Sequence, residues 1–449
     1  MTYTFHLQQG VKFQNGKDFK AEDVVYSLNR FRNPATSVWA SSLDAVSKVE
    51  ATDDYTVLIT TKVPYAPLLD KLAYFTCVMY PKDTVPTATS MIGTGPFQLD
   101  SLVANTTLTL VRNPNYWGYD ERHPQNQLPY IDTLKVLVIP DQATALAALR
   151  TGKIDDVNAL TAKQVQTLKT TNPNLVPISV LPSQAVTVDP RNDTAPFNDI
   201  RVRQAMQEAI DLPTLAKTYY GGSVDPWPST LMSNYMTGWG YPYSQWPQSL
   251  KDKYAYNPTA AKQLLAAAGY PNGFKTDCIA DNSADLDLLQ IVQSYFTAIG
   301  INMTVTTLDP ASFSSYVQMG HKQDAIAYRN GGALANGYDF FTMLGRFMTK
   351  TGYNYSMTAD PVYDAFYATA MATTSTDQMK QVMSDACKYV AEHFFAVSLL
   401  QVPNYTLCQP WLKGGYNGQS MSLSNAGIMY GFYTARFWID QNLKKSMGY

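Results

Sequence analysis

The chain has 449 residues, 45% of them hydrophobic and only 16% charged, and its formal net charge is −2. This length favours two or three domains, each with a sizeable core. The near-neutral charge excludes the basic surface that nucleic-acid-binding proteins need, so no nucleic-acid partner is expected. No apolar run reaches the ~18 residues of a membrane helix. The residues after Met1 read as a strand rather than a signal peptide.

The first 112 residues predict short strands around one amphipathic helix. A strand at 3–7 precedes this helix, whose apolar face runs from Val24 to Phe31. The stretch at 93–97 is interpreted as a turn and not as a phosphate loop, because Pro96 lacks an N–H group and no helix follows. The further elements expected in this part are a helix at 68–72 and strands at 47–51, 56–60, 97–102 and 106–112.

Residues 135–157 have the pattern of a βαβ unit. A strand at 135–139 is followed by a helix at 142–149 and a second strand at 154–157. Such a unit implies two parallel strands of one sheet, joined by the crossover helix.

A new lobe is expected to begin with the helix after Pro196. Asp199 is placed to cap this helix through a side-chain oxygen. Arg201 and Arg203 lie off its apolar face and are expected at the surface of the lobe or between the lobes. The apolar face itself is predicted to be core and consists of Val202, Ala205, Met206, Ala209 and Ile210.

The rest of the chain alternates helices and strands. Asn257 caps a helix that ends at Gly269. The aromatic, glycine-rich tail at 407–449 does not have the pattern of an independent domain. The elements expected between them are helices at 286–299, 310–319, 362–372 and 377–393 and strands at 301–305, 324–328 and 396–400.

No arrangement of residues predicts catalysis, a metal site or a cofactor. HExxH, GxSxG and P-loop motifs are absent. The chain is therefore not expected to be an enzyme, and no catalytic residue, metal or cofactor is expected. The histidines lie on unrelated segments and are His6, His123, His321 and His393.

The cysteines lack the C-x-x-C spacing of metal and redox sites. A disulfide between Cys387 and Cys408 and unpaired buried thiols are both open alternatives. The other two cysteines are Cys77 and Cys278.

Several motifs spread over nearly the whole chain are together typical of one protein family. They are YTFHL, GVKFQNG and AEDVVYS within 3–27, GTGPF at 93–97, RNPNYW at 112–117, ALRTGKID at 148–155, PFNDIRVRQA at 196–205 and AAGYPNG at 267–273. On these motifs the chain resembles the bacterial extracellular solute-binding proteins, family 5. This is the dipeptide, oligopeptide and nickel class, which delivers ligands to ABC importers.

The resemblance implies an α/β fold of the periplasmic-binding-protein type (type II), in which two lobes close over a ligand. Residues 1–92 are expected to form an extra subdomain of lobe I, 93–190 with 405–449 lobe I itself, and 191–404 lobe II. Family members begin with a signal sequence, often with a lipid-anchored cysteine, so the chain is expected to be N-terminally truncated. A monomer is expected in the periplasm or outside the cell, associated with the envelope and touching the membrane only through the transporter or a lipid anchor.

The resemblance also implies that the chain captures di- or oligopeptides and delivers them to the permease subunits of an ABC transporter. Asp339 matches the family's anchor for the peptide amine, and capping the following helix is its alternative role. Arg329 is expected to replace a carboxylate-binding arginine that is missing near Tyr316, or to form a surface salt bridge. Backbone groups at Asn330 and Gly331 are expected to meet the ligand.

Trp227, Trp239 and Trp246 lie in a stretch rich in proline and aromatic residues. They either wall the ligand pocket or pack lobe II. Because tryptophan-rich relatives bind sugars by ring stacking, oligosaccharides are an alternative ligand class, and nickel complexes are another. The alternative from a different class of protein is an enzyme that acts on glycosides in an aromatic-lined cleft.

Overall fold

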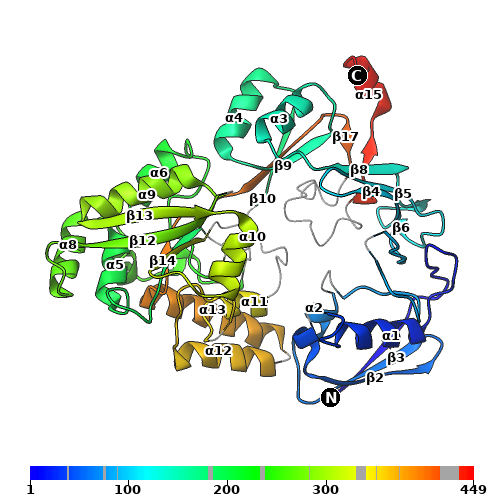
Figure 1. Ribbon diagram of the computed structural model, residues 1–449, viewed down its shortest axis with the longest axis horizontal. Coiled ribbons are helices and arrows are strands. Elements are labelled where there is room, and N and C mark those ends of the chain that lie inside the picture. Colours follow the sequence, from blue (N-terminus) through cyan, green and yellow to red (C-terminus); the bar gives the residue numbers. More distant parts are fainter. Residues whose placement is uncertain are drawn as a thin grey trace. The chain divides into compact units, whose positions relative to one another are not determined.

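The computed structural model describes residues 1–37, 40–73, 77–87, 89–180, 186–232, 238–282, 284–329, 340–349, 351–373, 375–414 and 434–449. The chain forms two compact units, which are described separately (Figure 1). Unit 1 comprises Met1–Val180 and Asn404–Tyr449, and unit 2 comprises Leu181–Pro403. None of the helices in the described ranges is long and apolar enough to span a membrane.

The N-terminal part of unit 1 is an antiparallel sheet with one helix packed on it (Figure 1). Its strands follow the order β1 (Thr2–His6), β3 (Thr56–Thr61), β2 (Val46–Asp53). Helix α1 (Ala21–Phe31) buries its predicted apolar face against β2 and β3. The expected strands and helix are thus confirmed. The short helices beside them are η1 (Ala40–Leu43) and α2 (Leu68–Leu72).

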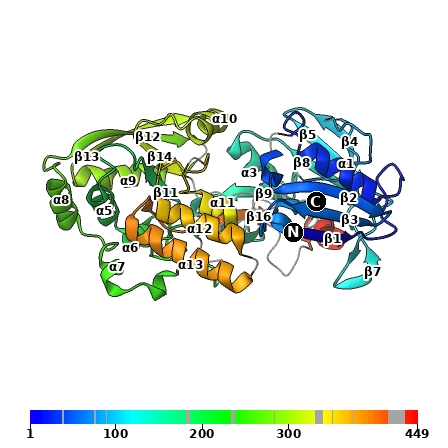
Figure 2. The same cartoon turned by 90° about the horizontal axis from the view of Figure 1, so that it is seen from below.

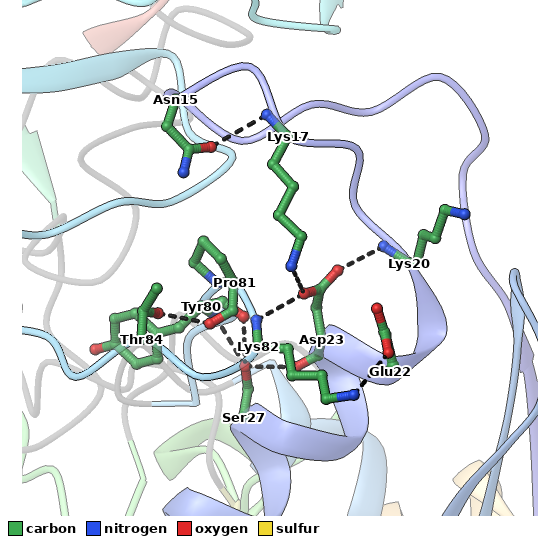
Figure 3. A network of polar contacts seen from close by, with 10 residues as sticks. All are labelled: Asn15, Lys17, Lys20, Glu22, Asp23, Ser27, Tyr80, Pro81, Lys82 and Thr84. Carbon is green, nitrogen blue, oxygen red and sulfur yellow. Dashed lines mark hydrogen bonds and ion pairs between the residues drawn. The ribbon is translucent and has the colours of Figure 1, made fainter.

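Asp23, in the first turn of α1, joins the start of this helix to a distant loop (Figure 3). Its buried carboxylate accepts hydrogen bonds from the backbone N–H groups of Lys20 (2.8 Å) and Lys82 (2.7 Å). One turn later, Ser27 Oγ donates to the carbonyl of Asp23 (2.7 Å) and accepts from the N–H of Tyr80 (2.8 Å). The two side chains thereby fix this loop against α1.

A second antiparallel sheet of unit 1 has the order β4 (Phe97–Val103), β5 (Thr107–Arg112), β8 (Thr133–Leu137). The small hairpin of β6 (Tyr119–Asp120) and β7 (His123–Gln127) comes between β5 and β8 in the chain. The predicted strands of this region are confirmed, and the stretch before β4 bends and leads into a strand instead of a helix, in agreement with the expected turn.

A third sheet of unit 1 joins segments that are far apart in the sequence. Strand β16 (Asn404–Cys408) lies between β9 (Asp156–Leu160) and β10 (Val176–Val180) and is antiparallel to both. The predicted βαβ unit is therefore wrong, because β8 and β9 belong to different sheets. The partner of β9 comes from the other end of the chain, and a local pattern does not reveal it.

The remaining elements of unit 1 pack around this third sheet or close the chain. Helix α3 (Gln142–Arg150) contacts β9, and α4 (Ala162–Thr171) contacts β16. Their shared core consists of Leu149, Leu160, Val165, Leu168, Leu175 and Leu407. The C-terminal elements are β17 (Leu412–Lys413), β18 (Trp438–Ile439) and α15 (Gln441–Ser446).

Unit 2 is built on a mixed five-stranded sheet (Figures 1 and 2). Its order is β13 (Ile301–Leu308), β12 (Phe274–Asp281), β14 (Ile326–Arg329), β11 (Thr187–Pro190), β15 (Val397–Ser398). β12 runs parallel to β13 and β14, whereas β11 is antiparallel to β14 and β15. Because β11 belongs to this sheet, the expected lobe boundary after residue 190 lies too late. The sequence pattern does not predict β12.

Helices before, between and after the strands pack around this sheet. Helix α9 contacts β13, α5 contacts β15, and α12 and α13 lie side by side (Figure 2). The α-helices are α5 (Ile200–Glu208), α6 (Leu212–Thr218), α7 (Gln248–Asp252), α8 (Pro258–Ala267), α9 (Leu286–Ala298), α10 (Pro310–Phe313), α11 (Phe340–Gly345), α12 (Pro361–Ala372) and α13 (Thr376–His393). A short 3₁₀ helix, η2 (Tyr243–Gln245), and a π-helix, η3 (Ser314–Met319), are also present.

Helix α5 starts where the sequence predicts. The Asp199 side chain accepts a hydrogen bond from the backbone N–H of Arg201 (2.9 Å), which satisfies a free donor of the first turn. All five residues of the predicted apolar face are buried. Arg201 is exposed, as expected, and its guanidinium pairs with Asp199 (2.5 Å).

Arg203 is not at the surface, so the prediction for this residue is wrong. Its buried guanidinium donates to the carbonyls of Phe197 (2.6 Å), Phe394 (2.8 Å) and His393 (3.1 Å). Two of these carbonyls belong to the end of α13, where the last carbonyls of a helix have no partner within the helix. A guanidinium supplies the donors that this buried helix end needs.

The four cysteines, which all lie in the described ranges, are free and buried. Cys387 lies in α13 of unit 2, whereas Cys408 lies in β16 of unit 1. The predicted disulfide is therefore wrong, and the alternative of unpaired buried thiols is confirmed. Burial raises the pKa of Cys387 to about 12, so its thiol stays protonated and unreactive at neutral pH.

Candidate ligand-binding site

The candidate site lies at one edge of the sheet in unit 2. Because β12 and β14 are parallel, both end at this edge, with Asp281 and Arg329 as their last residues. The parallel strand β13 also ends here and leads into α10 and η3. In open α/β sheets, ligands bind outside the carboxyl ends of the parallel strands. This edge is therefore where a ligand-binding position is expected in unit 2.

A buried ion pair connects this edge to β11. The strand register pairs Thr187 with Arg329, and Asp189 points to the same face two residues later. Asp189 Oδ2 accepts a hydrogen bond from Arg329 Nε (2.8 Å), and Oδ1 accepts one from the Thr187 hydroxyl (2.6 Å). Burial alone would raise the pKa of Asp189, but the charges of Arg329 and Arg346 outweigh it and the pKa is lowered. Asp189 is therefore ionised at neutral pH.

Arg346, directly after α11, adds a second guanidinium to this cluster. Its Nη2 donates to the hydroxyl oxygen of Thr187 and lies 3.5 Å from Asp189 Oδ1. Burial and the neighbouring charge of Arg329 lower the pKa of Arg346 to about 10, so it stays protonated at neutral pH. We call Asp189, Arg329 and Arg346 the ion cluster; their side chains are at most 6% exposed.

Aromatic rings support Arg329 at the edge of the sheet. Its guanidinium carbon lies 3.7 Å from the ring centroid of Tyr355, well within cation–π distance, and Nη2 donates to the carbonyl of Tyr353 (2.8 Å). Tyr355 in turn meets Phe313 of α10 edge to face, with ring centroids 6.0 Å apart. Tyr316, which follows Phe313 by three residues, is 37% exposed. The edge thus combines a fixed cation with aromatic surface.

The structure brings two of the predicted ligand residues, Arg329 and Tyr316, to this one region of unit 2. The strand and the helical segment that carry them share a cluster of buried residues, namely Phe313, Val317, Ala327 and Tyr355. The alternative of a surface salt bridge for Arg329 is wrong, because both partners of its ion pair are buried. Three further predicted residues, Asp339, Asn330 and Gly331, lie outside the described residues.

The three predicted tryptophans differ in their surroundings. Trp246 is 4% exposed, donates from Nε1 to the carbonyl of Tyr241 (3.0 Å) and belongs to a core cluster, so it packs the unit. Trp227 is half-buried and stacks on Tyr243 with the two ring planes 5° apart. Trp239 is half-buried as well. Only Trp227 and Trp239 therefore keep ring surface that a ligand is able to touch.

The described residues show no group of three or more His, Cys, Asp or Glu side chains that could hold a metal ion. Among the ionisable groups of the described part, the ion cluster has the deepest burial of opposite charges. The cluster consists of two guanidinium groups and one carboxylate.

Asp189, Arg346 and Tyr355 are site residues that the sequence does not reveal. Asp189 lies in a strand whose four residues are all buried, and a charged residue is almost never fully buried unless it is paired. Such a charge would be a signal, but only the fold shows that the strand is buried. The other two residues follow segments that carry no regular pattern.

Comparisons with known proteins agree with this architecture. A family model described as bacterial extracellular solute-binding proteins, family 5, matches residues 1–351. The glutathione-binding protein GsiB of Shigella flexneri is 29% identical over 392 residues, which cover 83% of this chain and 72% of that protein. This chain belongs to a family of solute-binding proteins and not to a family of enzymes.

Two solved structures share the fold. The periplasmic binding protein DppA of Helicobacter pylori, in complex with the peptide STSA, has a TM-score of 0.79 and 23% identity, covering 98% of this chain and 87% of that one. NikZ of Campylobacter jejuni, in complex with Ni(L-His), has a TM-score of 0.80 and 20% identity, covering 97% and 88%. The predicted α/β fold of the periplasmic-binding-protein type is confirmed. The chain belongs to the bacterial extracellular solute-binding proteins, family 5, and has their substrate-binding role in an ABC importer.

Proposed function

We propose that the solute of this chain is a short peptide, bound at the carboxyl edge of the sheet in unit 2. The observation that carries this proposal is the guanidinium of Arg329, which is fixed by Asp189 and stacked on Tyr355 at that edge. A peptide combines a carboxylate with side chains of varied polarity, and a cation set among aromatic rings suits both. The glutathione-binding relatives and the similar structure with a bound peptide support the same class.

In this proposal Arg329 holds a carboxylate of the peptide. Its Nε is used by Asp189 and its Nη2 by the carbonyl of Tyr353, and neither bond uses Nη1. Nη1 is therefore the atom assigned to the ligand. Asp339 receives the peptide amine, which gives the ligand one charged contact at each end.

The other predicted residues contribute shape and apolar contact. Tyr316 offers an exposed ring on the helical segment that packs against the strand of Arg329. Asn330 and Gly331 are assigned backbone contacts with the peptide, and Trp227 and Trp239 are assigned the apolar wall. Trp246 supports that wall from within the core.

The same proposal places the chain in the periplasm or outside the cell. It acts as a monomer, transfers its solute to the permease subunits, carries out no catalysis, and meets the membrane through those subunits or a lipid anchor. Light scattering on the purified chain checks the monomer, and the expected mass is 49.9 kDa.

Thermal unfolding of the purified chain tests the solute class. The candidates are glutathione, di- to pentapeptides, nickel with histidine, and cello-oligosaccharides. A ligand at 100 times its dissociation constant stabilises the folded state by about 2.7 kcal/mol and raises the unfolding temperature. A shift with a peptide supports the proposal. Shifts only with sugars or only with the nickel complex contradict it.

Tyr316→Ala tests the position of the site. Loss of this exposed ring is expected to weaken the binding of a peptide identified in the screen about tenfold, or about 1.4 kcal/mol, without lowering the unfolding temperature. Tyr256→Ala is the matched control, because Tyr256 is 44% exposed on the same unit and lies just before the cap of α8. Equal affinities of the two variants would place the peptide elsewhere.

A further inference from the structure

The ion cluster carries more positive than negative charge. Arg329 and Arg346 are cations, and Asp189 is the one carboxylate that the described part of unit 2 places in contact with either guanidinium. Two cations and one anion leave one positive charge in excess. Buried charges are ordinarily paired, because an unpaired ion loses its hydration without compensation.

Arg346 also has N–H donors without acceptors. A guanidinium has five N–H donors on three nitrogens. Nη2 donates to Thr187 and approaches Asp189, whereas Nε and Nη1 are buried and have no hydrogen-bond partner in the ranges described. Buried donors without an acceptor are rare and destabilising. Two of them on one buried cation mark a position that would stabilise a negatively charged acceptor.

The other neighbours of Arg346 do not supply such an acceptor. The ring centroid of Phe347 lies 5.2 Å from the guanidinium carbon. Tyr363 supplies no negative charge, because burial raises the pKa of its hydroxyl well above the ordinary value. The charge of Asp281 acts on Tyr355, whereas Asp189 is the carboxylate whose charge acts on Arg346.

We propose that Nε and Nη1 of Arg346 form a binding site for an anion with a single negative charge. Charge-assisted N–H donors suit a carboxylate oxygen or a halide equally, and the anion completes the charge balance of the ion cluster. The anion comes from one of two sources. A carboxylate of the captured solute is the first, and this source rests on the peptide-binding function proposed above. A small inorganic anion such as chloride is the second, and it is independent of that function.

A chloride titration tests the inorganic source. Thermal unfolding of the ligand-free chain is followed while chloride replaces a bulky organic sulfonate at constant ionic strength. At 100 times its dissociation constant, chloride is expected to raise the apparent folding constant about 100-fold. Arg346→Met is expected to abolish this dependence. Arg201→Met should retain it, because Arg201 is an exposed arginine of the same unit and already has a carboxylate partner.

A comparison of glutathione with its dimethyl ester tests the carboxylate source. By calorimetry, the wild type is expected to bind the acid at least about tenfold more tightly than the ester, since a charge-assisted bond is lost. Arg346→Met should lower this preference without abolishing it, because Arg329 keeps its own proposed contact with a carboxylate, and Arg201→Met should keep the preference in full. If no peptide binds at all, the peptide-binding function is contradicted, and the chloride titration alone decides the anion site.

Crystal structures of the wild type test the anion site even if Arg346→Met does not fold. The wild type is crystallised without peptide and soaked in bromide, and separately crystallised with glutathione. Anomalous density for bromide, or a carboxylate, within hydrogen-bond distance of Nε or Nη1 is the expected result. The proposal is overturned if stability ignores chloride, acid and ester bind equally, and neither crystal shows an anion beside Arg346.

Discussion

Replacing Asp23 by alanine tests whether the contacts in Figure 3 hold the N-terminal part of unit 1 together. The carboxylate of Asp23 is 1% exposed and accepts hydrogen bonds from the backbone N–H groups of Lys20 and Lys82. Hydrogen bonds to a charged group contribute roughly 1.5–3 kcal/mol each, and their loss leaves two donors without acceptors. Asp23→Ala is therefore expected to lower the free energy of unfolding by about 3–5 kcal/mol.

Urea unfolding followed by far-ultraviolet circular dichroism measures this loss, with Glu22→Ala as the control. Glu22 is the neighbouring residue and pairs with the ammonium of Lys82 (3.0 Å), but its side chain is 48% exposed, so its removal should hardly move the urea midpoint. Hydrogen exchange adds a local readout, because the amide of Lys82 should lose protection in Asp23→Ala alone. Equal midpoints for the two variants, with the Lys82 amide still protected, would refute the reasoning.

Three further predictions concern unit 2. The pKa of Asp189 is lowered in the folded state, so its ionised form stabilises the fold fully at any pH above the unfolded-state pKa of about 3.9. This stabilisation is lost as the pH falls below that value, and the urea midpoint measured across acid pH should fall accordingly. Gly273→Ala should lower the free energy of unfolding by roughly 3 kcal/mol or more, because φ at this position is +72° and a Cβ atom would lie 1.9 Å from a backbone oxygen. Gly269→Ala has open space around the new Cβ atom and should cost only about 1 kcal/mol. Calorimetry of the two variants measures this difference in stability. Arg203→Met should lower the free energy of unfolding by about 3–5 kcal/mol, since three carbonyls lose their donor, whereas Arg201→Met should leave the urea midpoint nearly unchanged.

The sequence predicts best those elements whose signals lie within a few residues. Asp199 and Asn257 mark helix starts, and both side chains accept the expected backbone N–H bonds of the first turn. Strand β12 is missed, because FKTDCIAD mixes charged and apolar residues and shows neither alternation nor a continuous apolar run. Its place in the sheet comes from pairing with β13 and β14, which are strands on either side of it in space.

Contacts between distant segments are the part that the sequence does not reveal. The ion pair of Asp189 and Arg329 joins residues 140 positions apart, and β9 pairs with a strand from the C-terminal part of the chain. Arg203 is missed for a related reason, because its acceptors lie at the end of α13 and an arginine beside a helix start reads as a surface residue. In each case the sequence lacks the identity of a distant contact partner, and the local preference for helix or strand does not supply it.

The motifs that carry the family resemblance contain residues that stabilise the fold. Asp23 and Ser27 fix a loop to α1, and Asn113 is 2% exposed and donates to the carbonyl of Gly95 (2.8 Å). The ion cluster contains no residue of these motifs. Exchanges within the motifs should therefore change stability and leave the choice of solute intact. Exchanges in the ion cluster and its aromatic support should change which solute binds, since that is where unit 2 presents charge at the carboxyl edge of its sheet.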